Sequence, residues 1–447
     1  MRKLTRRSQM FLYAISGFGI NFLNLMMGSY LCSALLIGGF GEDAIPFQTF
    51  RQHDLVIAGV WAMFVLAAKI IDGVIDIPLA SLTDNLRSRW GRRRPSLLIG
   101  LVPMLLAYVL FLVVPNPNAA TWLNTIYFGV ILCLFYSSYT LVMVTYYATF
   151  TEIVETERER SFISNVKSVC DIFYFILGYV IIRMMLNNNN IKDVALWTLP
   201  LALTMLIPLF MIREDSSLKL EQTAKSVNLI KSLRVTFRNK TFILWMVLYF
   251  FMTFGVQLFL GGINEYFSFV GMNMVMVMGG TFSPVPFMLI FYNYLCRRKG
   301  FKFAFCYALS MFAAGMILLF FVGFMDQGIA KTIMSIVSGL CCSCAVGALF
   351  SVNYSVPSQL AAEEQEKTGI SNAAMYFAVQ GLFSGVATGL ATGVVLTALK
   401  GSESNTSGAI VYMTLIAGLA TLVAACLITI LPKSMMNTQA KSNTQKD

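Results

Sequence analysis

The chain has 447 residues, of which 57% are hydrophobic and only 12% are charged. Ordinary soluble domains carry about a quarter charged residues, so this composition excludes a soluble globular protein and indicates a membrane protein. Lysine and arginine outnumber aspartate and glutamate by 33 to 22, an excess that in a membrane protein indicates basic cytoplasmic loops rather than a nucleic-acid-binding surface.

Twelve long apolar runs follow one another along the chain. Each is close to or longer than the roughly 20 residues that a helix needs to cross the hydrocarbon core, and none alternates strictly, so helices are expected. The first run is too long for the apolar core of a signal peptide and is expected to be a span. The runs cover about residues 10–37, 54–81, 96–114, 121–148, 163–186, 194–212, 241–264, 274–295, 303–324, 329–354, 371–398 and 408–431.

Basic residues are distributed unevenly between the connecting loops. With the N-terminus inside, 26 of the 33 lysines and arginines fall on the inner side, five on the outer side and two within spans. Because cytoplasmic loops carry the excess of lysine and arginine, this distribution predicts a multi-pass protein of the cell (inner) membrane with both termini in the cytoplasm.

The longest inner loop separates the sixth span from the seventh. It is polar, carries seven basic residues and divides the chain into a six-helix half, a cytoplasmic linker and a second six-helix half with a short cytoplasmic tail, at residues 1–212, 213–240 and 241–447. This plan is typical of major-facilitator transporters, whose solute site lies near the membrane midplane. Two unrelated bundles joined by a linker are the alternative.

Three charged residues, Lys69, Asp72 and Asp76, lie in the second span. Each charge at membrane depth costs about 3 kcal/mol on insertion scales, so the three are expected to face a cavity or one another. Their spacing places all three on one face of a helix. Carboxylates one turn apart can hold a hard monovalent cation or a proton. A purely structural salt bridge is the alternative.

A compact basic motif follows this span, with five arginines within eight residues. A plain basic loop would need no aspartate or glycine at fixed places, and Asp84 can pair with the arginines or with a helix N-terminus. We expect a cytoplasmic gate formed by Asp84, Arg87, Arg89, Gly91, Arg92, Arg93 and Arg94.

The run from Lys69 to Pro95 resembles the signature of the glycoside–pentoside–hexuronide:cation symporters, the melibiose-permease branch of the major facilitator superfamily. That signature reads K-x-x-D-x-x-x-D-x-P and then D-x-x-R-S-R-W-G-R-x-R/K-P. The segments at 157–160 and 357–369 are also similar to segments of the family. The resemblance implies an all-α membrane protein with twelve helices in two halves. It further implies symport, by alternating access, of a sugar, glycoside or similar small polar solute with Na⁺ or H⁺.

The resemblance also implies where the coupling cation binds. The family's cation carboxylates correspond to Asp72 and Asp76, and its threonine ligand corresponds to Thr140. The asparagine that precedes the second carboxylate in melibiose permease is Ile75 here. This loss of an oxygen ligand leans towards a proton, and the choice between Na⁺ and H⁺ stays open.

The family's sugar-binding residues are not retained. Its two sugar-binding aspartates correspond to Asn21 and Met143, and the lysine of its eleventh helix falls near Gly385. A basic residue that the family often has corresponds to Lys167. The identity of the sugar therefore stays open.

Several other polar residues at membrane depth are candidates for a solute cavity. Amide groups offer both donors and acceptors to hydroxyl-rich ligands, although each one alone could instead join two helices. Lys167 and Asp171, one turn apart, can neutralise each other. The expected cavity residues are Asn21, Asn24, Lys69, Lys167, Asp171, Gln257, Asn264, Tyr376 and Gln380.

Other functions are less consistent with these residues. There is one histidine, His53 in the first outer loop, and no pattern of catalytic or metal-ligating residues, so neither an enzyme nor a cofactor beyond the coupling ion is expected. The remaining alternative is a facilitator or a lipid transporter of the same superfamily, in which the aspartate pair is structural.

Overall fold

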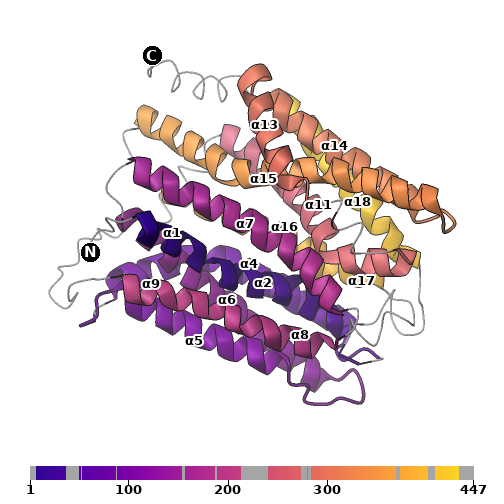
Figure 1. The fold of residues 1–447 in the computed structure, drawn as a ribbon, viewed down its shortest axis with the longest axis horizontal. Coiled ribbons are helices and arrows are strands. Elements are labelled where there is room, and N and C mark those ends of the chain that lie inside the picture. The colour runs from indigo at the N-terminus through magenta and orange to yellow at the C-terminus, as the bar shows by residue number, and fades with distance from the viewer. Residues whose placement is uncertain are drawn as a thin grey trace. The chain divides into compact units, whose positions relative to one another are not determined.

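The computed structural model describes residues 7–36, 50–51, 53–86, 88–153, 157–186, 189–212, 240–272, 279, 283–368, 373–400 and 408–431. Every regular element in these ranges is a helix (Figure 1). The described residues form two compact units, residues 7–212 and residues 240–431. Apart from Lys240, the expected linker lies outside the described residues.

Eleven helical segments in the described ranges are long and apolar enough to cross a membrane. They are Arg7–Leu35, Ala58–Ile75, Arg93–Phe111, Trp122–Tyr147, Val169–Leu186, Ile191–Met211, Lys240–Phe267, Phe301–Val322, Ile329–Ala348, Val379–Lys400 and Gly408–Ile430. The expected eighth span corresponds to a shorter helix, α13 (Val285–Lys299), and the residues before it lie largely outside the described ranges.

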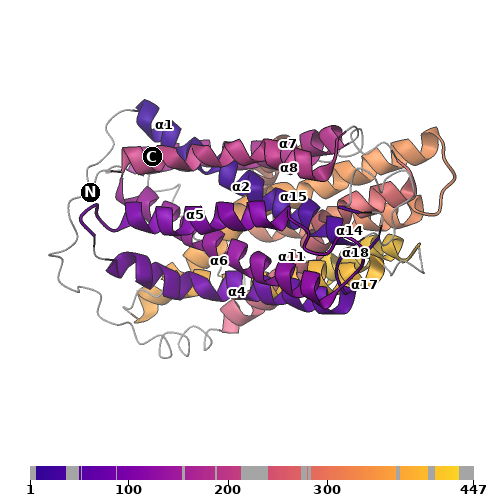
Figure 2. The ribbon, with the colours of Figure 1, turned by 90° about the horizontal axis from the view of Figure 1, so that it is seen from below.

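Three long helices make up much of the first unit (Figure 2). They are α4 (Ala58–Asn85), α5 (Arg93–Phe111) and α6 (Trp122–Glu152). Helix α6 packs against both α4 and α5, which scarcely touch each other. Because α6 is apolar on all sides, it can be buried between two neighbours.

The first span of this unit is interrupted. It consists of α1 (Arg7–Ser16), α2 (Phe18–Leu25), the π-helical turn η1 (Met26–Leu31) and the 3₁₀ turn η2 (Ser33–Leu35). Helix α7 (Glu157–Leu186) packs against α1 and α2, and its first turn contains the acidic and basic segment at residues 157–160. The π-helical turn is notable because such turns occur often at functional sites.

The sixth span is interrupted as well, by Pro200 and Pro208, which cannot donate a backbone hydrogen bond. It consists of α8 (Ile191–Thr198), the 3₁₀ helix η3 (Leu199–Met205) and α9 (Leu206–Met211). Gly19 of α2 lies directly against η3, where a Cβ atom would come within 1.7 Å of the backbone oxygen of Leu201. The two interrupted spans therefore meet backbone to backbone.

We expect Gly19→Ala to destabilise the protein by about 3 kcal/mol, since the added methyl group meets backbone rather than a movable side chain. Gly59→Ala is the matched control, because a Cβ atom at Gly59 meets nothing within 4 Å. Thermal unfolding of the purified protein in detergent measures the difference. A melting temperature of the Gly19 variant equal to that of the control would contradict this packing.

The second unit is built around α11 and α14. Helix α11 (Lys240–Val270) packs against α16 (Ala373–Thr388) and α18 (Tyr412–Ile430), and α14 (Phe301–Val322) packs against α18 and α15 (Ile329–Thr368). The 40 residues of α15 span about 60 Å, so this helix extends beyond the hydrocarbon core.

The eleventh span of the chain, which lies in the second unit, changes from an α-helix to a π-helix and back. After α16 the chain forms the π-helix η5 (Gly389–Val395) and then α17 (Leu396–Lys400). The 3₁₀ turn η6 (Gly408–Val411) then leads into α18. Each unit therefore contains one span with a π-helical segment.

Candidate functional site

Two charged residues of α4 lie against α6. The hydroxyl of Thr140 donates a hydrogen bond to Oδ1 of Asp72. The ammonium of Lys69 lies 3.6 Å from the centre of the Tyr136 ring. Asp76 lies one turn further along α4, but its side chain is outside the described part of the structure. The structure thus brings together Asp72 and Thr140, which come from two different spans.

The Tyr136 ring gives Lys69 a partner other than a carboxylate. A cation over an aromatic face is attracted by about 1 kcal/mol or more where water is excluded. Asp72 still feels the charge of Lys69, from which it is separated by less than one helical turn. The carboxylate and hydroxyl oxygens of Asp72 and Thr140 are the kind of donors that a hard cation prefers. This pair could hold Na⁺, and the carboxylate alone could hold a proton.

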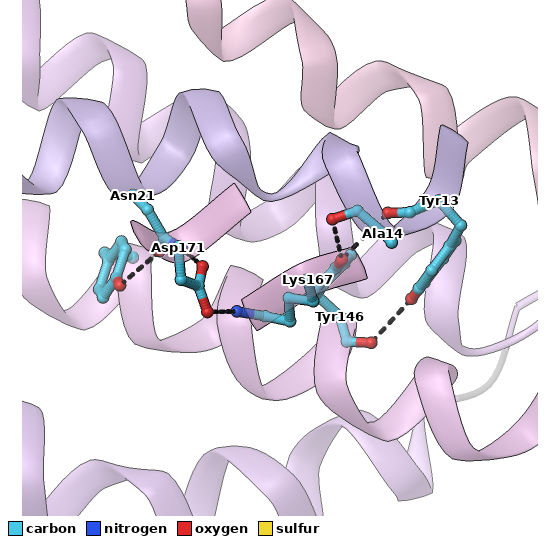
Figure 3. Close-up of polar contacts among 7 residues, drawn as sticks. Tyr13, Ala14, Asn21, Tyr146, Lys167 and Asp171 are labelled. Atoms are coloured by element: carbon cyan, nitrogen blue, oxygen red, sulfur yellow. Dashed lines mark hydrogen bonds and ion pairs between the residues drawn. The ribbon is translucent and has the colours of Figure 1, made fainter. Parts of the chain in front are cut away.

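A second group of polar residues, the Asp171 cluster, consists of Asn21, Tyr139, Lys167 and Asp171. Figure 3 shows Asn21, Lys167 and Asp171 of this cluster. Lys167 Nζ lies 2.5 Å from Asp171 Oδ2, and Asn21 Nδ2 donates to Asp171 Oδ1 over 3.2 Å. The Tyr139 hydroxyl donates to Asn21 Oδ1 over 3.1 Å. The cluster therefore ties α2, α6 and α7 together, and both oxygens of Asp171 are engaged.

Two tyrosines clamp α1 to α6 beside this cluster (Figure 3). The rings of Tyr13 and Tyr146 stack with their centres 4.9 Å apart. The Tyr13 hydroxyl donates to the Tyr146 carbonyl over 2.7 Å, and the Tyr146 hydroxyl donates to the Tyr13 carbonyl over 3.0 Å. These reciprocal hydrogen bonds fix the position of the first span next to Lys167.

Asn24 differs from Asn21, its neighbour one turn earlier on α2. Its Oδ1 atom is buried and has no hydrogen-bond partner in the described part of the chain. A buried acceptor without a partner costs about 1–3 kcal/mol. Asn24 also lies just before η1, where the helix changes its winding. This residue is therefore the one in the first span that is best suited to accept a hydrogen bond from a ligand.

The four expected cavity residues of the second unit lie on α11 and α16. Asn264 is buried and Gln257 is half-buried. Gln380 and Tyr376 are buried and join the two helices: Trp245 Nε1 donates to Gln380 Oε1 over 3.1 Å, and the rings of Tyr376 and Phe242 lie 4.3 Å apart. For these last two, the contacts match the alternative of interhelical packing.

The basic motif after α4 forms a tight turn. Gly91 has a φ of 85°, a conformation that a residue with a side chain rarely adopts, which explains the glycine. Arg93 is buried, and its Nη1 atom lies 3.4 Å from the hydroxyl of Thr83. Arg89 is exposed, and Arg92 and Arg94 are half-buried. Arg87 and the side chain of Asp84 lie outside the described part, so their pairing stays a prediction.

Two sets of residues with clear contacts were not among the expected site residues. Tyr136 and Tyr139, one turn apart on α6, hold Lys69 and Asn21, and their position next to Thr140 could have indicated them. Glu265 and Lys400 form a buried ion pair in the second unit. Lys400 was expected in an outer loop, but it is the last residue of α17.

Comparison with known sequences places the chain among transporters. An uncharacterized symporter of Synechocystis sp. is 30% identical over 125 residues, which cover 27% of this chain and 22% of that protein. A glucuronide carrier protein homolog of Escherichia coli is 22% identical over 196 residues, 41% of this chain and 42% of that protein. The chain thus matches less than half the length of either relative.

Solved structures share the fold over nearly the whole chain. A D-xylose–proton symporter has a TM-score of 0.66 at 15% identity and covers 94% of this chain and 96% of its own. A mutant form of the nucleoside transporter NupG has a TM-score of 0.64 at 13% identity, with 95% and 98% covered. Inward-open XylE, the xylose transporter of E. coli, has a TM-score of 0.63 at 15% identity, with 95% of each chain covered. The predicted major-facilitator fold is confirmed.

The family model described as MFS/sugar transport protein matches residues 12–432. This match, the symporter relative and the glucuronide carrier homolog confirm the resemblance stated from residues 69–95, and the family consists of membrane transporters rather than enzymes. The chain belongs to the MFS/sugar transport protein family.

Proposed function

We propose that this protein is a secondary active transporter that couples the movement of Na⁺ or H⁺ down its gradient to the symport of a small polar solute. The observation that carries the proposal is the hydrogen bond between Asp72 and Thr140, because it assembles oxygen donors from two spans at membrane depth. Lys69 lies on the Tyr136 ring, and the hydrogen bond of Asp72 to Thr140 uses its Oδ1 atom, so Oδ2 is the oxygen that we propose for the coupling ion. Asp76 is the next proposed ligand.

The solute is proposed to be a neutral sugar or glycoside that binds near the Asp171 cluster. Lys167 is neutralised by Asp171, so within this cluster it offers no free positive charge to an anionic uronide. The unpartnered oxygen of Asn24 suits a hydroxyl donor. The glucuronide carrier homolog supports a carbohydrate-like substrate. The pairing of Lys167 with Asp171 favours a neutral carbohydrate over a charged one.

Identification of the solute is the experiment that tests this function. Uptake of labelled sugars, glycosides and uronides into cells or membrane vesicles is measured with Na⁺ and pH varied separately. We expect a neutral sugar or glycoside to be accumulated and one of the two ions to control that accumulation. Accumulation of uronides alone would contradict the neutral solute, and uptake that only equilibrates would indicate a facilitator.

We expect Asn24→Leu to weaken binding of the identified solute about tenfold, because one hydrogen bond is worth about 1–1.5 kcal/mol. Deoxy analogues of the solute are the control. The difference in binding between wild type and Asn24→Leu should vanish for the one analogue that lacks the hydroxyl that donates to Asn24. Transport kinetics across the deoxy series provide the measurement. An equal loss for every analogue would show that Asn24 acts through packing.

Both termini and the linker are proposed to be cytoplasmic, on the distribution of basic residues. Reporter proteins fused within residues 213–240 and at the C-terminus should therefore both give a cytoplasmic signal. A periplasmic or external signal from either fusion would overturn the orientation and the assignment of the basic motif to a cytoplasmic gate.

A further inference from the structure

A buried ion pair joins the seventh and eleventh spans of the chain, both of which lie in the second unit. Oε1 of Glu265, on α11, lies 2.6 Å from Nζ of Lys400, on α17, and the two residues are 0% and 3% exposed. The second oxygen of Glu265, Oε2, is also buried and has no hydrogen-bond partner among the described residues. The carboxylate therefore has one charged partner and one free acceptor.

Within the described ranges, Lys400 alone balances the charge of Glu265. Besides α17, which carries Lys400, the described elements α16, η5, η6 and α18 pack against α11 and contain no aspartate, glutamate, lysine, arginine or histidine. Helix α14 also contacts α11, and its one charged residue, Lys302, binds the Leu431 carbonyl. Lys331 of α15 directs its ammonium to the carbonyl of Val270, 3.1 Å away at the end of α11, and feels the charge of Asp326. The neighbouring titratable group, Tyr266, donates its hydroxyl to the Leu319 carbonyl.

The helices approach one another closely just before the ion pair. A Cβ atom at Gly262 would lie 2.1 Å from the sulfur of Met413, and one at Gly261 would lie 2.6 Å from Cγ2 of Thr392. Glu265 follows these glycines by about one turn and is packed among the same helices. Its charge is thus removed from water by tight packing, not merely by membrane depth.

An ion pair in such a place is expensive as a purely structural device. Removing two charges from water costs several kcal/mol per ion, and apolar side chains of similar size often stabilise a protein as well or better. Charged residues inside membranes therefore commonly mark ion or proton pathways. The cost of burying the Glu265–Lys400 pair indicates a function that requires the charges of these two side chains.

The two partners differ in how easily they can reach water. Lys400 is the last residue of α17, and a lysine at a helix end can extend its long side chain to the membrane interface. Glu265 lies five residues before the end of α11, about 7.5 Å along the helix axis, and has a short side chain. A second arrangement is therefore available in which Lys400 reaches the interface and Glu265 stays inside without a charge.

We propose that Glu265 is a proton-binding site, separate from Asp72, and that protonation releases α17 from α11. One proton adds to Oε2 of Glu265 and gives a neutral carboxyl group. Lys400 keeps its own proton and moves to the interface. Each separation of the two residues therefore takes up one proton, which is bound by Glu265. The ion pair is then a latch that is closed when Glu265 is ionised and open when it is protonated. This proposal does not depend on the solute or on the coupling ion at Asp72.

The test uses purified full-length protein in lipid and needs no solute. Infrared difference spectra between about pH 8 and about pH 3, on either side of the ordinary carboxyl range, show the C=O band of each carboxyl that gains a proton. Wild-type protein is compared with the double variant Glu265→Gln/Lys400→Met, which removes both charges and so leaves none unpaired. Lys331→Met, which removes another buried lysine, is the control.

We expect the double variant to lack one carboxyl band that wild type and the Lys331 variant both show. If the spectra of wild type and double variant are the same, Glu265 binds no proton and the proposal is wrong. Should the double variant not fold, Glu265→Gln/Lys400→Gln takes its place. Thermal unfolding tests the latch itself: the stability of wild type relative to the double variant should differ between about pH 8 and about pH 3, because the charge of Glu265 is then linked to folding through Lys400. A constant difference would show that the pair is only structural.

Discussion

Replacement of Asp72 by asparagine is expected to abolish accumulation of the solute while leaving the protein in the membrane. Asparagine has nearly the same shape as aspartate, so helix packing is preserved, but it cannot supply the negative charge that attracts a cation. Outer-shell partners of bound metals already contribute about 10–100-fold to affinity, so loss of a direct ligand should reduce gradient-driven uptake at least about 100-fold. Uptake normalised to the protein in the membrane is the measurement.

Two threonines of α6 provide a matched pair for the same test. Thr140 donates its hydroxyl to Asp72, whereas Thr145 donates to the Leu141 carbonyl within its own helix. Thr140→Val should weaken the response to the coupling ion about tenfold, the effect of one hydrogen bond or ligand, and Thr145→Val should leave it unchanged. If Asp72→Asn accumulates solute like wild type, the ion site lies elsewhere.

The second large effect is expected at the Asp171 cluster. Asp171→Asn leaves Lys167 as a buried charge without its counter-ion, and Lys167→Met leaves Asp171 in the same position, so each should destabilise the protein by about 3 kcal/mol. The double variant Lys167→Met/Asp171→Asn removes both charges and should regain most of this loss. Unfolding of the four proteins in detergent gives the coupling free energy. Additive effects of the two single changes would show that the pair contributes little.

The course of the chain through the membrane could be predicted because it depends on local properties. Apolar runs of sufficient length located eleven of the twelve predicted spans, since a membrane requires long helices whatever their neighbours are. The interruptions of the first span were not predicted. Next to the first interruption, Gly19 lies against Leu201, a contact between residues far apart in the sequence.

The same distinction between local and distant contacts applies to the site. The spacing of Lys69 and Asp72 on one helix placed both on one face, but periodicity alone could not show that Thr140 and Tyr136 of α6 would meet them. The partnership of Asn21 with Asp171 spans 150 residues. The pairing of Glu265 with Lys400 was not predicted, because each lies near a span end, where charged residues are ordinary.

The central claim is that a cation gradient drives accumulation through the site at Asp72. The most direct measurement uses purified protein in liposomes, with the solute identified in the uptake panel and a Na⁺ or pH gradient imposed separately. Wild type should accumulate solute above the external concentration under one of the two gradients and release it when an ionophore collapses that gradient, while Asp72→Asn should do neither. Equilibration of the solute by both proteins, unaffected by either gradient, would contradict the claim.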